Sequence, residues 1–211
     1  MRLSPKDLID NPEFELLFRL EHKNIKEFVK EQLRKKSRLT KGYLWYQFSM
    51  ATLLVALITS GLILWYVKSA MAILFIIGAF CFAFTVLIFI HEMLHGLAFL
   101  LLGFKKISFG GNIRKFVFYA QADLQVLSRH ELYFLALFPL VTIKAVTIAA
   151  ILVTIFMHSP WLWFWMVVMA LHSFFCAGDV GLISFFKHHP DKVLFTFDSK
   201  MEKCSYFYQR K

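Results

Sequence analysis

Charge is scarce in this sequence, and cysteine is scarcer. Only 18% of the 211 residues are charged, while 58% are hydrophobic and 25 are phenylalanine. A chain with so little charge is too apolar for a soluble domain of this size. The three cysteines, Cys81, Cys176 and Cys204, are odd in number and lack the spacing of a zinc ribbon or a disulfide framework. We interpret them as reduced thiols that serve in packing.

The sequence contains long stretches without charged residues. These stretches predict an all-α polytopic membrane protein with about four transmembrane helices. A short β-hairpin is expected between the second and third helices, and no internal repeat is visible. The expected order is a basic cytosolic segment (1–43), a membrane domain (44–186) with spans at 44–67, 70–102, 132–157 and 161–186 and a hairpin loop at 103–131, and a basic tail (187–211).

The N-terminal segment is expected to contain a cytosolic amphipathic helix. Asn11-Pro12 is typical of a helix start, and apolar residues then recur at helical spacing up to Leu33. This helix would lie along the membrane or against the domain's own cytosolic surface, or it would be a solvated linker. A basic cluster near its end is positioned to meet anionic lipid headgroups: Arg34, Lys35, Lys36, Arg38 and Lys41.

The hairpin is expected from two stretches rich in aromatic and β-branched residues, 105–109 and 114–121, which flank Gly110-Gly111-Asn112. Its edge would pair with an extended substrate segment, or the hairpin would be an ordinary connection at the membrane surface.

The distribution of basic residues predicts the orientation. Eleven Lys and Arg residues precede the first span, and six follow the fourth. The three connections between the spans contain one, five and none, in chain order. This alternation places both termini in the cytosol. The net charge of +10 therefore indicates membrane-flanking segments and not nucleic acid binding. The first forty residues are polar, so we expect no cleavable signal peptide and an uncleaved first span.

An H-E-x-x-H motif at His91, Glu92 and His95 lies inside the second span. Residues four apart share a face of a helix, so the two imidazoles can bind one Zn²⁺ ion. Glu92 is then placed to accept a proton from the attacking water. The motif also occurs by chance, but ionisable groups in an apolar span are functional candidates by default.

Asp179 is the candidate third ligand. With 1.5 Å per residue, His91 and His95 lie about 10 to 17 Å inside the cytosolic end of their span, and Asp179 lies about 10 Å inside the end of the fourth. The alternative is an ion pair between Asp179 and Lys144. His172 would sit about 10 Å deeper, too far to bind the same ion in an undistorted helix. His172 and Lys144 are therefore candidates for residues that contact the metal ligands. The alternative for His172 is a polar residue whose hydrogen bonds are satisfied between helices.

The motif and its surroundings resemble the bacterial zincin peptidases of integral membranes, which are related to site-2 proteases. The resemblance covers most of 70–186 and rests on His-Glu-Met-Leu-His-Gly at 91–96, Leu-Leu-Gly-Phe at 101–104, Ala-Leu-Phe-Pro at 136–139 and Ala-Gly-Asp at 177–179. It implies that Asp179 corresponds to the aspartate ligand of a later span. Asp179 lacks the preceding Asn-Pro of site-2 proteases, which favours a side branch.

We therefore predict a zinc metalloendopeptidase of the bacterial cell membrane that binds one Zn²⁺ and cleaves a membrane protein or peptide near the cytoplasmic leaflet. The alternatives are a non-catalytic binding or regulatory module, a metal or proton transporter, and a membrane di-iron oxidase. A di-iron site needs several histidine clusters, and here the other six histidines are scattered. The oligomeric state and the substrate's identity do not follow from the sequence.

Overall fold

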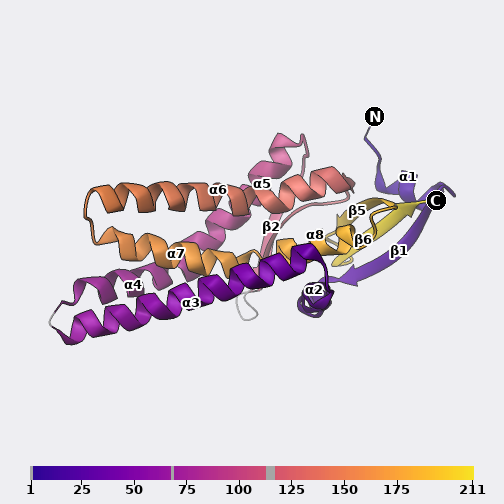
Figure 1. The fold of residues 1–211 in the computed structure, drawn as a ribbon. Helices are drawn as coiled ribbons and strands as arrows, with labels where there is room; N and C mark the ends of the chain where they lie inside the picture. Colours follow the sequence, from indigo (N-terminus) through magenta and orange to yellow (C-terminus); the bar gives the residue numbers. More distant parts are fainter. Residues whose placement is uncertain (1, 68, 113–116) are drawn as a thin grey trace. The chain divides into compact units, whose positions relative to one another are not determined.

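The computed structural model describes residues 2–67, 69–112 and 117–211 (Figure 1). Helices make up most of the chain, and strands occur in three regions. In chain order the elements are α1 (Pro5–Asp10), β1 (Phe14–Glu21), η1 (His22–Asn24), α2 (Ile25–Arg34), α3 (Arg38–Tyr66), α4 (Met71–Phe82), the π-helical η2 (Ala83–Leu87), α5 (Ile88–Leu101), β2 (Ile107–Asn112), β3 (Val117–Ala122), β4 (Leu127–Ser128), α6 (Arg129–Phe156), α7 (Trp161–Phe175), α8 (Ala177–Lys187), β5 (Val193–Ser199) and β6 (Cys204–Arg210).

The chain divides into two compact units. The first, here called the polar unit, comprises Met1–Thr40, Glu92–Phe138 and Gly178–Lys211. The second, the apolar unit, comprises Lys41–His91 and Pro139–Ala177. Helices α3, α5, α6 and α8 contribute residues to both units, because each of the four boundaries falls within a helix.

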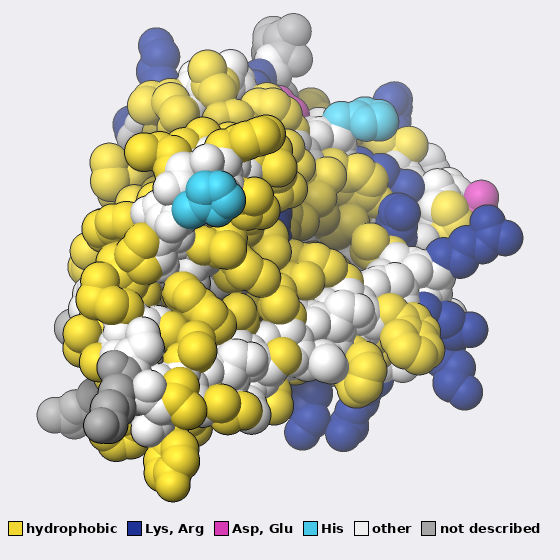
Figure 2. Space-filling model, turned by 60° about the vertical axis from the view of Figure 1, so that its left-hand side comes forward, with side chains coloured by type: hydrophobic (Ala, Val, Ile, Leu, Met, Phe, Trp, Pro, Cys, Tyr) yellow, Lys and Arg dark blue, Asp and Glu magenta, His cyan; other side chains and the backbone are white. Residues whose placement is uncertain are grey.

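Three helical segments are long and apolar enough to cross a membrane: α3, the continuous run from Met71 to Leu101, and α6. A fourth span results if α7 and α8, which meet at a bend of 42°, count as one. Only 11 to 22% of the residues in the three apolar windows are buried inside the chain. Hydrophobic side chains accordingly cover most of the face drawn in Figure 2. Such a surface suits hydrocarbon, so three to four spans are consistent with a membrane protein.

In the apolar unit, α4 packs against α7 through aromatic rings. Phe75 meets Trp161 and Phe82 meets Phe164, with centroids 4.9 and 5.4 Å apart. Polar contacts join α3 to the end of α7: the hydroxyl of Tyr43 donates to the backbone oxygen of Ser173 at 2.9 Å. These contacts fix α7, which carries His172, against its neighbours.

The expectation of an all-α chain is wrong at both ends of the sequence. Residues 14–21, expected in a helix, form β1, and the tail forms the β5–β6 hairpin. Together with β4 they make an antiparallel sheet in the order β1-β6-β5-β4 (Figure 1). β1 pairs along its length with β6, from Phe14 opposite Arg210 to Glu21 opposite Cys204. The partner strand lies about 190 residues away, so local periodicity alone favoured a helix.

Within the segment expected to be helical, Ile25–Arg34 form helix α2. It packs against α8 inside the polar unit, which answers where its apolar face goes. Phe28 lies in one buried cluster with Phe185 and Phe186, and the hydroxyl of Ser184 donates to the backbone oxygen of Gln32 at 3.2 Å. A Cβ at Gly181 would come within 3.2 Å of the Val29 side chain, so glycine permits this close approach.

A hairpin follows α5, as expected, but its glycines lie elsewhere. β2 and β3 pair from Ile107 opposite Ala122 to Asn112 opposite Val117. Gly110 and Gly111 are therefore strand residues and not the turn. The part of the expected second stretch at 114–116 lies outside the described residues.

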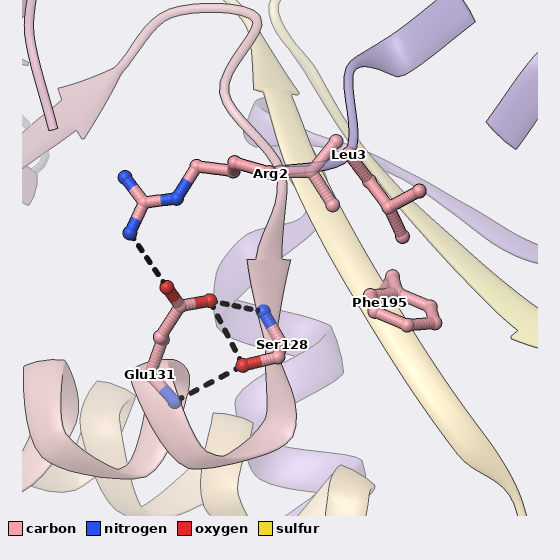
Figure 3. Close-up of a pocket in the computed structure, with 6 residues that line it drawn as sticks. Arg2, Leu3, Ser128, Glu131 and Phe195 are labelled. Carbon is pink, nitrogen blue, oxygen red and sulfur yellow. Dashed lines mark hydrogen bonds and ion pairs between the residues drawn. The ribbon is translucent and has the colours of Figure 1, made fainter. Parts of the chain in front are cut away.

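The start of α6 is fixed by a reciprocal cap (Figure 3). The carboxylate of Glu131 accepts from the backbone N–H and the hydroxyl of Ser128, both at 2.8 Å. The guanidinium of Arg2 donates to the other oxygen of Glu131 at 2.8 Å and to the backbone oxygen of Leu102 at 2.7 Å. Arg2 therefore links the end of α5 to the start of α6.

Candidate metal centre

Helix α5 runs unbroken from Ile88 to Leu101 and carries the whole H-E-x-x-H motif. His91 and His95 are both buried and lie one turn apart on the same face of this helix. Glu92 is partly exposed and directly follows His91. The spacing of the first two expected ligands is therefore set by one continuous helix.

The C-terminal end of α5 is held by a glycine turn. Gly103 has a φ of +78°, its N–H donates to the backbone oxygen of Leu100, and the N–H of Phe104 donates to that of Phe99. These two bonds form a Schellman cap, which needs a left-handed residue. Beyond the cap, Phe104 packs with Ala98 and Phe99 in a buried cluster with α6 and the β-strands. The motif thus lies on a helix whose end is anchored in the polar unit.

Glycine also follows the motif, at Gly96, where the hairpin touches α5. A Cβ there would lie 2.5 Å from Cζ of Phe109 on β2. Any side chain at this position would push the ring away. The β2–β3 hairpin is therefore next to the second histidine of the motif, within the same unit.

The Nδ1 atoms of both histidines have partners. Nδ1 of His95 lies 3.1 Å from the backbone oxygen of Leu135, and because a carbonyl only accepts, this nitrogen carries a proton. Nδ1 of His91 lies 3.1 Å from Nε2 of His172. Ligating histidines commonly use one ring nitrogen in this way, which directs the other nitrogen towards the metal.

Asp179 lies in the first turn of α8, just after the bend. Its Oδ1 atom is 3.2 Å from Nε2 of His95, and both side chains are mostly buried. With the proton of neutral His95 on Nδ1, two acceptor atoms face each other, and a cation or a second proton must lie between them. Two ligands of a tetrahedral zinc at about 2.0 to 2.2 Å are about 3.3 to 3.5 Å apart. The His95–Asp179 pair fits that requirement.

The bend between α7 and α8 changes the depth argument made from the sequence. α7 ends at Phe175, Cys176 leaves the helix, and α8 begins at Ala177. The fourth apolar segment is therefore not the undistorted helix on which the greater depth of His172 depended. His172 is fully buried with its ring against that of His91, at a centroid distance of 5.3 Å.

Lys144 makes its contacts elsewhere in the apolar unit. Its ammonium group donates to the backbone oxygen of Met169 at 2.5 Å and lies 5.1 Å from the centroid of the Tyr46 ring. These contacts join α6 to α7 and α3.

Cys176 is the residue that sequence reasoning missed. Its Sγ atom lies 3.7 Å from Nε2 of His172, and both side chains are fully buried. With His91 they form a group whose ligand atoms all lie within 4.8 Å of one another. The spacing of His172 and Cys176, four residues apart, was the available signal, and it is the same as that of His91 and His95.

Comparison with known proteins gives a family match. A family model described as "Putative zincin peptidase" matches residues 84–194, which is more than half of the chain and includes the motif, His172 and Asp179. No curated protein and no solved structure matches.

Proposed function

The chain belongs to the family described as "Putative zincin peptidase", and from this we propose that it is a membrane-embedded zinc metallopeptidase of the site-2 protease type. The H-E-x-x-H motif on an unbroken α5 carries the proposal. Its substrates would be peptide bonds of membrane-associated proteins or peptides, cleaved near the cytoplasmic leaflet. The apolar helices that contain the motif support a membrane substrate.

We assign His91, His95 and Asp179 as the ligands of one Zn²⁺ ion. Support comes from two pairs that share His95: one turn of α5 relates it to His91, and 3.2 Å separates its Nε2 atom from Oδ1 of Asp179. Two imidazoles and one carboxylate are a ligand set of catalytic zinc sites, which keep the fourth position open. The Leu135 carbonyl and His172 would orient the two rings.

When bound, zinc supplies Lewis acidity to the scissile carbonyl and lowers the pKa of water. Glu92 acts as the general base, accepts the proton of the attacking water and passes it to the leaving amine. Its place beside His91 on α5 brings its carboxylate to the same turn as the ligands. Lys144, whose contacts are with Met169 and Tyr46, has a supporting role in helix packing.

The β2–β3 hairpin is our candidate for holding the substrate. A helical substrate hides its peptide bonds and must unwind before cleavage. The Phe109 ring on β2 contacts Gly96, directly after His95, so the hairpin edge is close to the motif within one unit. Strand addition at that edge would hold the unwound segment extended.

We place both termini in the cytosol and the membrane in a bacterial cell. Basic residues flanking the start of α3 would contact anionic lipid headgroups: Arg34, Lys35, Lys36, Arg38 and Lys41.

The test uses detergent-purified full-length protein, elemental analysis and a panel of membrane-derived peptides. Wild type should hold about one zinc per chain and cleave at least one peptide. Glu92→Gln should keep the zinc and lose about 10²- to 10⁴-fold in kcat. Glu27→Gln, an exposed glutamate on α2, is the matched control and should cleave as wild type does.

Zinc binding with equal cleavage by Glu92→Gln and wild type would exclude this mechanism. Zinc binding without any cleavage would favour a binding module, and iron in place of zinc would favour an oxidase.

A further inference from the structure

The apolar unit contains a ligand pair of its own. His172 lies in the last turn of α7. Cys176, four residues later, is the residue at which this helix ends. Both side chains are fully buried, and His91 of the same unit is nearly so. Two imidazoles and a thiol therefore come together in a unit that contains no acidic residue, although Glu92 directly follows His91 in the sequence.

Two of the three distances among these atoms are close to those expected around a shared metal ion. Nδ1 of His91 and Nε2 of His172 are 3.1 Å apart, and Sγ of Cys176 is 3.7 Å from Nε2 of His172. Around a tetrahedral ion with metal–nitrogen and metal–sulfur bonds of about 2.0 and 2.3 Å, the corresponding separations are about 3.3 and 3.5 Å. Each of the three residues offers one such atom, and all of these lie within 4.8 Å of one another.

We propose that His91, His172 and Cys176 form a second metal site, and that its occupation excludes zinc from the catalytic set. The thiolate makes this site selective for soft ions, of which Cd²⁺ and Cu⁺ are examples. On binding, the Cys176 thiol releases its proton to solvent and both imidazoles bind as neutral rings, so no electron is transferred.

The exclusion follows from the chemistry of His91. A neutral imidazole has one nitrogen with a lone pair and one that carries the proton. When Nε2 of His91 serves the catalytic set, Nδ1 is protonated and donates to Nε2 of His172. When Nδ1 binds a soft ion, the proton moves to Nε2, which can no longer be a ligand. One ring therefore serves one site at a time.

The exclusion rests on the proposed function, whereas metal binding at the second site does not. Soft metal ions would thus inhibit the peptidase by binding at a site that does not include Asp179. Inhibition would depend on Cys176, which has no place in the catalytic set.

The first experiment titrates metal-free, full-length protein in detergent with Cd²⁺ and follows the thiolate-to-cadmium charge-transfer band in the ultraviolet difference spectrum. Wild type and Asp179→Ala should develop the band, while Cys176→Ser and Cys176→Ala should lack it and bind Cd²⁺ at least about tenfold more weakly. Cys81→Ala removes an exposed thiol of α4 and should keep the full band. A band of equal size in the Cys176 variants overturns the site.

The second experiment adds Cd²⁺ to the zinc-loaded protein and measures released zinc and remaining peptidase activity. Wild type and Cys81→Ala should be inhibited at Cd²⁺ concentrations at least about tenfold lower than Cys176→Ser. Equal inhibition of Cys176→Ser and wild type overturns the exclusion. A charge-transfer band in a protein without peptidase activity would refute the proposed function and leave the second site standing.

Discussion

The two units differ most in where acidic residues occur. All 14 Asp and Glu residues belong to the polar unit, and the apolar unit has none. The candidate site residues divide between the units: Glu92, His95 and Asp179 belong to the polar unit, while His91, His172 and the Cys176 thiol belong to the apolar one. Residues that are neutral when unliganded can be buried among hydrocarbon groups at low cost, whereas a carboxylate needs partners. Both candidate carboxylates therefore come from the polar unit, and the candidate thiol ligand comes from the apolar one.

The largest expected effect comes from removing the polar unit's ligands. His95→Ala and Asp179→Ala should each reduce bound zinc from about one per chain to near zero, because a zinc site with two protein ligands is weak. Elemental analysis after dialysis measures the loss. His158→Ala, an exposed histidine after α6, is the control and should retain zinc. Retention of zinc by Asp179→Ala would move the third ligand elsewhere, with His172 as the next candidate.

A second prediction places a carboxylate in the apolar unit. Cys176→Asp, at the end of α7, should destabilise the metal-free protein by up to about 2.5 to 3.5 kcal/mol, the cost of an aspartate at the centre of an apolar helix. Cys204→Asp is the matched substitution in the polar unit, where that cysteine is equally buried and interacts with the Arg19 guanidinium. It should cost less, because the Arg19 guanidinium hydrogen-bonds to this side chain, whereas the Lys144 ammonium has only a coulombic interaction with Cys176. Thermal unfolding in a chelating buffer compares the two, and equal losses would remove the distinction between the units.

Much of this organisation was predictable from the sequence. The apolar segments fixed the positions of α3, of the Met71–Leu101 run and of α6, since long apolar runs have few alternatives. The H-E-x-x-H motif could be recognised because its two histidines share one helix, where the spacing of residues determines which face they occupy. The hairpin after α5 was also expected, although its glycines were assigned to the turn.

The features that depend on distant pairing were not predictable. β1 has apolar residues that suit a helix or a strand, and only β6, at the other end of the chain, decides between them. No proline marks the bend at Cys176 in the sequence, so a straight span was assumed. Asp179 was chosen by depth and by resemblance, and its 3.2 Å approach to His95 needed the folded chain.

A third prediction compares glycines of the two units. Gly96→Ala should cost about 1 to 3 kcal/mol, because its Cβ would meet the Phe109 ring at 2.5 Å. A Cβ added at Gly78, on the apolar α4, would meet no neighbouring atom within 4 Å. Gly78→Ala should therefore be neutral or stabilise the helix by up to about 1 kcal/mol. Denaturation of both variants measures the difference. In the double variant Gly96→Ala with Phe109→Ala, most of the Gly96→Ala penalty should disappear, and additive losses would refute the contact.

The smallest expected effect concerns a partly buried acid of the polar unit, Asp198. Burial raises the pKa of Asp198 on β5, and nearby Asp123 raises it further, while the Ser205 hydroxyl and His22 oppose the shift. Asp123 accepts from the backbone N–H of Lys200 at 2.8 Å.

Because the folded pKa of Asp198 lies above the unfolded value, its stabilising contribution is complete below the unfolded pKa of about 3.9 and is lost as pH rises through the folded pKa. Asp198→Asn keeps an acceptor for the Ser205 hydroxyl and cannot ionise. It should raise the thermal midpoint by a few degrees at pH 7 and change it little at pH 4. Asp191→Asn, exposed beside β5, should change neither. An equal shift at both pH values would show that Asp198 carries no pH-dependent cost, and that the polar unit buries a carboxylate without penalty.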